Sequence, residues 1–353
     1  MRILIPLLSL GKSGGLKVLT NLANNWSKMG IDTTIVVTNN LIEQYYDIQC
    51  NLIFLDDAGN VNKYSSNKHI PLYRQLYLMY KYMRQVSHEY DCVIANYNLT
   101  TYPIFLGSKS NNFYYIQAYE PEFYDKIKNN ILKKYIQKVL AWFSYFLPFT
   151  RIVNSNMYIN YKNIKTNYVV YPGIDLEIYF PKERSKKNNS DKFVIGCIGR
   201  KEEWKGSEDV AEAIKILHNK GYENIEFVVA FNAVSYKNHT LVYPDGDEKL
   251  ADFYRSLDIL VTPGHIQLEA IHYPVIEAMA TKTPLITTGY FPSNENNSFL
   301  VPIKSPEDIA RNIVYAINNY EIAIAKANIA YSQIQEFSWK NISDKFLNII
   351  RKE

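Results

Sequence analysis

The repeated alternation of short apolar runs with longer helical stretches is the feature that most constrains the fold of this chain. Runs rich in β-branched residues are typical of strands, and the stretches between them carry apolar residues at helical spacing. In residues 16–29, for example, Leu19, Leu22, Ala23 and Trp26 fall on one helical face. Strands that alternate with helices in this way predict parallel sheets with helices on both faces.

The alternation runs twice along the 353 residues, which predicts two α/β domains. It stops at a segment with Pro172, Gly173 and Pro181, residue types that favour a linker, and it starts again at residue 193. In the first half the expected strands are 1–7, 32–38, 52–55, 92–96, 112–117, 151–154 and 167–170, and the expected helices are 16–29, 72–88 and 131–146. In the second half the expected strands are 193–198, 226–231, 259–262 and 285–288, and the expected helices are 207–220, 248–256, 273–280, 306–318 and 339–351.

The composition is that of a soluble globular protein, with 47% hydrophobic and 21% charged residues. The cysteines Cys50, Cys92 and Cys197 lie far apart and match no metal-binding spacing, which favours a reducing compartment. The opening apolar run resembles a first strand rather than a secretion signal. No apolar stretch approaches the roughly 20 residues that span a bilayer. We therefore expect a cytoplasmic protein.

Charge is spread unevenly along the chain. Residues 1–172 hold 18 Lys and Arg against 10 Asp and Glu, a net charge of +8, whereas residues 173–353 hold 21 against 25, a net charge of −4. A basic N-terminal half favours an anionic acceptor or a membrane surface, and an ordinary solvated surface explains the same charge equally well. No nucleic-acid partner is expected, because no known binding motif or continuous basic patch is present.

A basic helix rich in aromatic residues is expected at residues 131–146. Its lysines and closing aromatic residues are Lys133, Lys134, Lys138, Trp142, Phe143, Tyr145 and Phe146. Such a helix can lie on an anionic membrane. Alternatively, it packs its aromatic side chains on the sheet of the first domain. The first interpretation predicts peripheral contact with the inner face of the cell membrane.

A loop bracketed by Gly199 and Gly206 follows the first strand of the second domain and carries Arg200, Lys201 and Lys205. A helix N-terminus with nearby cations suits a diphosphate. Arg200 would offer a planar fork of donors and Lys205 a point charge. A charged surface turn, neutralised by the glutamates of the same loop, is the alternative.

Two carboxylates, Glu269 and Glu277, lie eight residues apart between a predicted strand and a predicted helix. Glu277 is expected to accept hydrogen bonds from a ribose cis-diol, and Glu269 to lie nearer the sugar. Pro274 fits the first turn of the helix, where its missing N–H costs nothing. For either glutamate alone, a favourable interaction with the helix dipole, worth about 0.3–1 kcal/mol, is the alternative.

Residues 257–288 resemble the donor-binding signature of the family-4 glycosyltransferases. That signature contains two Glu separated by seven residues, then Ala-Met-Ala, then a strand opening with Thr-Pro. Here Glu269 and Glu277 supply the acids, residues 278–280 read Ala-Met-Ala, and the strand opens at Thr283.

Three further segments match the same family in the same order. Arg200 and Lys205 stand at the place of its Arg/Lys pair, residues 171–175 resemble its interdomain element, and the helix after Phe337 resembles its closing helix. The resemblance implies a GT-B fold, in which two Rossmann-like parallel-sheet domains face each other across a cleft.

The resemblance also implies the role of each part of the chain. Residues 1–172 would form an N-terminal acceptor-binding domain, and residues 173–337 a C-terminal nucleotide-sugar-binding domain. The helix within residues 338–353 would pack back on the N-terminal domain.

The N-terminal half resembles the family less closely. Gly14 and Gly15 stand where the family has a glycine-rich loop, and they are expected to contact the donor. Residues 115–124 resemble a segment of bacterial rhamnosyltransferases and their relatives in surface-glycan assembly. The acceptor contacts expected from this segment are Gln117, Tyr119 and Glu120.

The sequence His272-Tyr273-Pro274 resembles the same rhamnosyltransferases. Most family members have glycine where this chain has Ala270 and His272, and those glycines let backbone amides approach the donor. The rhamnosyltransferase relatives often have Asp where Ala118 stands. These departures bear on the roles of Glu269 and of the segment around Ala118.

The resemblance implies a retaining transfer that needs no metal ion, so that cations of the protein stabilise the leaving diphosphate. The expected catalytic residues are Arg200, Lys205, Glu269 and Glu120. The expected donor-binding residues are Gly14, Gly15, Gly199, Arg200, Lys205, His272, Tyr273 and Glu277.

The expected function is therefore the transfer of a hexose or deoxyhexose, rhamnose among them, in cell-surface polysaccharide synthesis. The donor would be a dTDP-, UDP- or GDP-sugar, the acceptor a glycan or lipid-linked glycan, and no cofactor is expected. Two alternatives stay open: a nucleotide-sugar epimerase of the same fold, and a non-catalytic member that binds nucleotide sugar or glycan.

Overall fold

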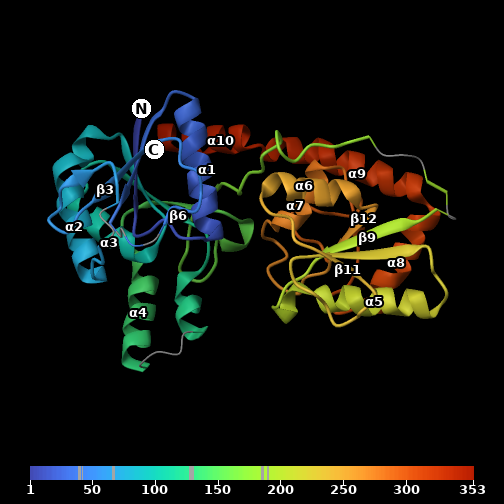
Figure 1. Cartoon of the computed structure of the whole chain (residues 1–353). Coiled ribbons are helices and arrows are strands. Elements are labelled where there is room, and N and C mark those ends of the chain that lie inside the picture. The colour runs from blue at the N-terminus through green and yellow to red at the C-terminus, as the bar shows by residue number, and fades with distance from the viewer. Residues whose placement is uncertain (39–40, 42, 66–67, 127–130, 184–186, 189–190) are drawn as a thin grey trace. The chain divides into compact units, whose positions relative to one another are not determined.

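The computed structural model describes the chain except for residues 39–40, 42, 66–67, 127–130, 184–186 and 189–190. It divides into two compact units (Figure 1). Unit 1 comprises Met1–Gly173 together with Trp339–Glu353, and unit 2 comprises Ile174–Ser338.

Unit 1 is built on a sheet that has eight strands among the described residues, in the order β4-β3-β2-β1-β5-β6-β7-β8. Neighbouring strands run parallel, except that β4 is antiparallel to β3. In chain order the strands are β1 (Arg2–Leu7), β2 (Asp32–Val37), β3 (Asn51–Leu55), β4 (Val61–Asn62), β5 (Cys92–Ala95), β6 (Asn111–Ile116), β7 (Thr150–Val153) and β8 (Tyr168–Val169).

The helices of unit 1 are α1 (Gly14–Lys28), α2 (Leu72–Val86), α3 (Asn98–Gly107), α4 (Ile131–Ser144) and α10 (Trp339–Lys352), with short helices η1 (Ser87–Glu89), η2 (Glu120–Lys126) and η3 (Asn156–Tyr158). The Ser13 hydroxyl caps α1 by accepting from the backbone N–H of Leu16 at 3.2 Å. This cap satisfies one of the amide groups that a helix leaves unpaired at its start.

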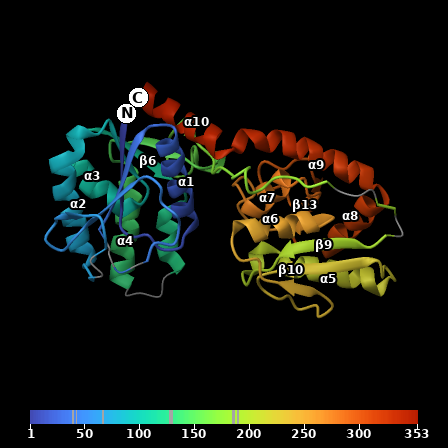
Figure 2. The same ribbon diagram turned by 45° about the horizontal axis from the view of Figure 1, so that its top comes forward.

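The C-terminal helix α10 packs in unit 1, beside α1 (Figure 2). The ring of Phe346 meets the rings of Trp26 and Tyr115 edge to face, with both centroid distances 5.2 Å. The indole N–H of Trp26 donates to the backbone oxygen of Ser343 at 3.2 Å. The expected return of the last helix to the N-terminal part of the chain is therefore confirmed.

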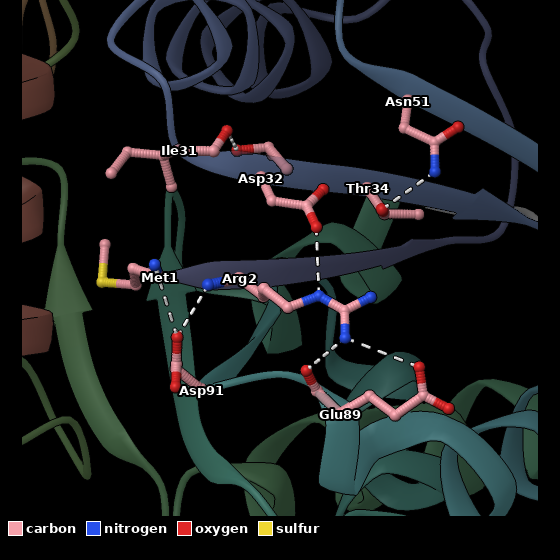
Figure 3. A network of polar contacts seen from close by, with 9 residues as sticks. Met1, Arg2, Ile31, Asp32, Thr34, Asn51, Glu89 and Asp91 are labelled. Carbon is pink, nitrogen blue, oxygen red and sulfur yellow. Dashed lines mark hydrogen bonds and ion pairs between the residues drawn. The ribbon is translucent and has the colours of Figure 1, made fainter.

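A polar network joins the amino ends of three neighbouring strands (Figure 3). The Arg2 guanidinium donates to Asp32 at 3.0 Å and to the backbone oxygen of Glu89 at 2.9 Å, while the Arg2 backbone N–H donates to Asp91 at 2.7 Å. These side chains are about half exposed, so each ion pair contributes about 1 kcal/mol or less. Because the charged groups at this amino-terminal edge pair with one another, the opposite, carboxyl edge is the better candidate for a ligand site.

Unit 2 is built on a parallel sheet of six strands, counted over the described ranges, in the order β11-β10-β9-β12-β13-β14. Its strands are β9 (Phe193–Ile198), β10 (Ile225–Ala230), β11 (Thr240–Val242), β12 (Ile259–Thr262), β13 (Leu285–Thr287) and β14 (Phe299–Leu300). Its helices are α5 (Ser207–Asn219), α6 (Asp247–Ser256), α7 (Tyr273–Ala280), α8 (Pro306–Asn318) and α9 (Tyr320–Ile334), with short helices η4 (Glu203–Lys205) and η5 (Gln335–Phe337).

Both faces of the unit 2 sheet are buried. One core cluster joins Phe193 and Ile195 of β9 to residues of α5 and α8. A second cluster joins Leu260 of β12 to residues of α6, α7 and α9, including Met279. Burial on both faces explains why these strands read as nearly continuous apolar runs.

The predicted fold class is confirmed: both units are Rossmann-like, with parallel strands connected through helices. Two helices, α3 and α9, were not among the expected ones. Over the residues that the structure describes, no helix combines the length and the apolar character that crossing a membrane requires.

Candidate active site

The loop after β9 is shaped by two glycines that no other residue could replace without a clash. Gly206 has a φ of 74°, and a Cβ there would lie 2.2 Å from the backbone oxygen of Pro263. A Cβ at Gly199 would lie 1.8 Å from the backbone oxygen of Asn232. The glycines therefore let the loop pack against the segments that follow β10 and β12, at the carboxyl edge of the unit 2 sheet.

Arg200 and Lys205 line one small cavity at this edge, of about 10 Å³, together with Ser207 and His272. Burial lowers the pKa of Lys205, and the nearby charge of Arg200 lowers it further. Within the described ranges neither cation forms an ion pair. The loop thus gathers positive charge that no carboxylate of those ranges neutralises directly, an arrangement that attracts an anion.

His272 immediately precedes α7, and its ring stacks on that of Tyr290 with centroids 4.3 Å apart and 21° between the planes. Burial holds the pKa of His272 well below its usual range, and the charges of Lys205 and Arg200 act in the same direction. Its Nδ1 atom is buried and has no hydrogen-bond partner among the described residues. A neutral imidazole therefore forms one wall of the cationic cavity.

Glu277 lies one turn into α7 and is only 4% exposed. Its carboxylate accepts a hydrogen bond from the Tyr254 hydroxyl at 2.7 Å. Burial raises the pKa of Tyr254 well above its usual range, and the Glu277 charge raises it further, whereas Arg200 acts in the opposite sense. Glu277, Tyr254 and Arg200 therefore share one electrostatic neighbourhood.

The other residues predicted around this site lie in different surroundings. Tyr273 is half-buried at the first position of α7. Glu269 lies in the loop between β12 and α7 with an exposed side chain, and it is not among the described residues that line the small cavity.

Unit 1 has a much larger cavity, of about 560 Å³, at the carboxyl ends of β1, β5 and β6. Its lining includes Gly15, Gln117 and Glu120. The Gln117 side-chain amide donates to the backbone oxygen of Gly15 at 3.0 Å, and a Cβ at Gly15 would lie 3.2 Å from that amide nitrogen. Gly14 is exposed at the first position of α1 and is absent from the described lining.

Glu120 presents a buried carboxyl group to this cavity. It accepts from the Tyr114 hydroxyl at 2.6 Å and from the backbone N–H of Asn98, at the start of α3, at 2.9 Å. Burial raises the pKa of Glu120 to about 8, even though both hydrogen bonds favour the charged form. The group therefore holds its proton near neutral pH.

Tyr119 does not share the cavity of Gln117 and Glu120. Its ring stacks on Tyr145, with centroids 5.6 Å apart, and its hydroxyl donates to Asn163 at 2.9 Å. It lines a separate cavity of about 270 Å³ that borders α4 at Trp142.

Sequence reasoning did not identify the partners of the two buried glutamates. Tyr254 lies 23 residues before Glu277, and Asn98 lies 22 residues before Glu120, so only the tertiary fold brings each pair together. The same holds for Tyr290, whose ring stacks on that of His272 although the two residues lie 18 positions apart in the sequence.

Residues 192–319 match the family model described as Glycosyl transferases group 1. A curated D-inositol 3-phosphate glycosyltransferase of Mycobacteroides abscessus is 23% identical over 203 residues, 51% of this chain and 45% of that protein. The capsular polysaccharide biosynthesis glycosyltransferase CapM of Staphylococcus aureus is 27% identical over 154 residues, 39% of this chain and 40% of CapM. The aligned part thus spans less than half the length of either relative.

Over the whole chain the fold matches solved structures. The structure of HepE of Anabaena in complex with UDP and glucose has a TM-score of 0.71, at 15% identity and with all of both chains covered. This likeness confirms the predicted GT-B fold. The rhamnosyl specificity that the sequence suggested stays a prediction.

Proposed function

We propose that this chain transfers a sugar from a nucleotide-diphosphate donor to a glycan in polysaccharide synthesis, because residues 192–319 match the model of the group 1 glycosyltransferases and the chain has the GT-B fold. The observation that carries this proposal is the pairing of Arg200 and Lys205 in one cavity beside a neutral His272. Two cations with no ion pair among the described residues are suited to a leaving group that gains negative charge.

The proposed reaction is a retaining exchange at the anomeric carbon. The bond from the sugar C1 to the diphosphate oxygen breaks, a bond from C1 to the acceptor oxygen forms, and the acceptor proton leaves with the diphosphate. Arg200 and Lys205 would stabilise the diphosphate as its charge grows. A volume of about 10 Å³ holds no more than one water molecule, so the diphosphate would lie at the mouth of this cavity.

Glu277 would hold the donor rather than move a proton. Its buried carboxylate, which accepts from Tyr254, would also accept from the hydroxyls of a ribose. Gly199, His272 and Tyr273 would complete the donor site. Glu269 would reach the sugar only from the exposed loop that precedes α7.

The acceptor would enter the large cavity of unit 1. Gln117 offers amide and carbonyl groups there, and a protonated Glu120 can donate a hydrogen bond to an acceptor oxygen. Gly15, which lines the same cavity, and Gly14 beside it would contact the donor, as the resemblance implies. Tyr119 would contact an acceptor only through the separate cavity beside α4.

The likeness to HepE, whose structure contains UDP and glucose, makes a UDP-hexose the first donor to test. A dTDP-sugar such as dTDP-rhamnose and a GDP-sugar are the other candidates. A metal-independent transfer and a lipid-linked acceptor are further parts of this proposal.

A thermal-shift screen with UDP, GDP, dTDP and ADP and their sugar conjugates tests the donor site. Binding at about 100 times the dissociation constant adds roughly 2.7 kcal/mol to the free energy of unfolding, so one nucleotide class should clearly raise the melting temperature. The Lys201→Ala variant, which alters an exposed cation of the same loop outside the cavity lining, should respond as the native chain does. If no nucleotide shifted the melting temperature, the donor site would be wrongly assigned.

Incubation with the donor alone separates the alternatives. An epimerase would change the configuration of the sugar without an acceptor. A transferase would release free sugar slowly, through hydrolysis. A chain that binds a nucleotide sugar but transfers it to no acceptor in a broad panel of glycans would be a non-catalytic member.

A further inference from the structure

The helix α4 exposes its apolar side chains and turns several polar ones towards the rest of unit 1, which is the reverse of an ordinary surface helix. Its side chains that lie against the rest of unit 1, buried or half-buried, are those of Lys134, Gln137, Lys138, Ala141 and Ser144. Its exposed side chains are mostly apolar or aromatic: Ile131, Leu132, Tyr135, Ile136, Val139, Leu140, Trp142 and Phe143. Surface helices normally have the opposite arrangement. The expectation that the aromatic residues of this helix pack on the sheet is therefore wrong for Trp142 and Phe143, and correct for the buried Tyr145 that follows α4.

This outer face of α4 is extensive. Ile131 is 85% exposed, Leu132 and Tyr135 are each 66% exposed, and Phe146, just beyond the helix, is 53% exposed. Figure 1 shows α4 running away from the sheet of unit 1, and its packing partners within the unit are α3 and η2. Monomeric proteins rarely expose a continuous apolar patch of this kind unless something covers it.

The charge around the patch indicates what covers it. The α4 sequence contains Lys133, Lys134 and Lys138 and no acidic residue. Unit 1 as a whole holds 22 Lys and Arg against 12 Asp and Glu, a net charge of +10, whereas unit 2 holds 17 against 23, a net charge of −6. An apolar, aromatic face beside the exposed Lys133, on a unit of net positive charge, complements the acyl chains and anionic headgroups of a lipid bilayer.

The length of α4 fixes how it would meet a bilayer. Fourteen residues at about 1.5 Å per residue give a helix of roughly 21 Å, shorter than the ~30 Å hydrocarbon core. The helix therefore fits the plane of the interface and not a path across it. Tyr135 and Trp142 are amphipathic residues that favour the headgroup level.

A second copy of the chain is a poorer occupant. Pairing two outer faces of α4 would bring two units of net positive charge together, and the exposed Lys133 of each helix would meet no acidic side chain on the other helix. Lipid headgroups instead supply the negative charge that the helix lacks.

We infer that the outer face of α4 inserts into the headgroup boundary of an anionic membrane and holds unit 1 at the lipid surface. The inference does not depend on the proposed transferase activity, although a membrane-bound protein of this kind would meet a lipid-linked acceptor directly.

Flotation with lipid vesicles tests the inference. The full chain should float with vesicles of equal parts phosphatidylcholine and phosphatidylglycerol, and weakly or not at all with phosphatidylcholine alone. The double variant Ile136→Asn, Phe143→Ser removes two exposed apolar side chains and should lower the partition coefficient by roughly a hundredfold. The matched control Tyr73→Ser, Tyr77→Ser alters two exposed aromatic residues of α2 and should leave partitioning unchanged.

Charge is tested separately. Lys133→Glu reverses one exposed charge on α4 and should reduce binding to the anionic vesicles about thirtyfold, at roughly 1 kcal/mol for each unit of charge. Lys81→Glu on α2 reverses an exposed charge away from the patch and should have a much smaller effect. Since all the altered side chains are exposed, each variant should keep the native melting temperature, and Lys133→Glu remains a test if the double variant fails to fold.

Three results would overturn the inference: no flotation of the native chain with anionic vesicles, equal flotation of the Ile136/Phe143 variant, or a stable dimer without lipid that the same substitutions dissociate. The nucleotide-induced thermal shift, measured on the same samples, keeps this outcome distinct from that of the proposed function. A chain that binds nucleotide and ignores vesicles would contradict only the membrane inference.

Discussion

The cavities at the carboxyl edges of the two sheets differ in size and in the residues that line them. At the edge of unit 2, glycines draw a loop tightly inward, two cations lie close together, and the cavity measures about 10 Å³. At the edge of unit 1, the cavity measures about 560 Å³ and presents amide, hydroxyl and carboxyl groups. A small edge that gathers two cations suits a ligand whose anionic part is always the same, and a wide edge lined by polar groups and a single lysine, Lys12, suits a ligand of variable shape.

One device is common to both edges: a buried glutamate that accepts a hydrogen bond from a tyrosine. In unit 2 the pair is Glu277 and Tyr254, at 2.7 Å, and in unit 1 it is Glu120 and Tyr114, at 2.6 Å. Substitutions of the cations, the glycines and these two pairs test the proposed assignment of one edge to the donor and the other to the acceptor.

Removing the cations should have the largest effect. In the double variant Arg200→Ala, Lys205→Ala, kcat/KM should fall by about a thousandfold, because the leaving diphosphate loses both of its stabilising charges. Steady-state transfer assays measure this change. The Lys201→Ala variant should retain nearly full activity, and an equal loss in that variant would show that only the overall charge of the loop matters.

Replacing a glycine by alanine should lower the free energy of unfolding by several kcal/mol more in the loop of unit 2 than at the start of α1 in unit 1. Gly199→Ala places a Cβ 1.8 Å from the Asn232 oxygen and should lower the free energy of unfolding by about 3 kcal/mol or more. At Gly14 a Cβ meets nothing within 4 Å, so Gly14→Ala should change stability by no more than about 0.5 kcal/mol. Urea unfolding of both variants checks this. A tolerated alanine at 199 would contradict the close packing of the loop.

The tyrosine–glutamate pairs should separate stability from donor binding. Tyr254→Phe and Tyr114→Phe each remove a hydrogen bond to a buried carboxyl group and should each cost about 2 kcal/mol of stability. Calorimetric titration with the nucleotide should show weaker binding only for Tyr254→Phe. Weaker binding in Tyr114→Phe instead would reverse the assignment of the two edges.

The pH dependence should be the subtlest difference. The pKa of Glu120 is raised to about 8, so the folded chain holds a proton that the unfolded chain releases near pH 4.5. The stabilisation from this group is fully present below the unfolded pKa and is lost as the pH rises towards 8, by up to about 1.4 kcal/mol per pH unit. In the Glu120→Gln variant, this pH dependence of the free energy of unfolding should disappear between about pH 5 and about pH 8. An unchanged slope would mean that other groups cause it.

The regular parts of the fold could be predicted from the sequence because their signals are local. Strands buried on both faces give apolar runs, as in β9 and β12, and the spacing of apolar residues in α1 predicts a helix directly. The helix α3 was missed because Pro103 interrupts its pattern, and α9 because its apolar residues spread around the helix rather than along one face.

The candidate site also has a part that could be predicted from local sequence and a part that could not. The pairing of Arg200 with Lys205 was predicted because both lie in one short loop. Tyr119 and Glu120 are neighbours in sequence, and yet they line different cavities, because their side chains point in different directions where the chain enters η2 after β6. Likewise, the spacing in α4 predicts an amphipathic helix without indicating which face is turned outward. That direction depends on the tertiary fold.

The placement of α10 has a consequence for how the chain is made. Unit 2 is one continuous segment, whereas unit 1 lacks the partner of Trp26 until Phe346 has been synthesised. On the ribosome, the central segment can therefore fold to completion while the first 173 residues still wait for their last helix. The two crossings of the chain lie side by side, where the Ile174 N–H donates to the Phe337 oxygen at 2.8 Å. Any exchange of unit 2 between relatives, in evolution or by engineering, must therefore cut and rejoin the chain at both crossings.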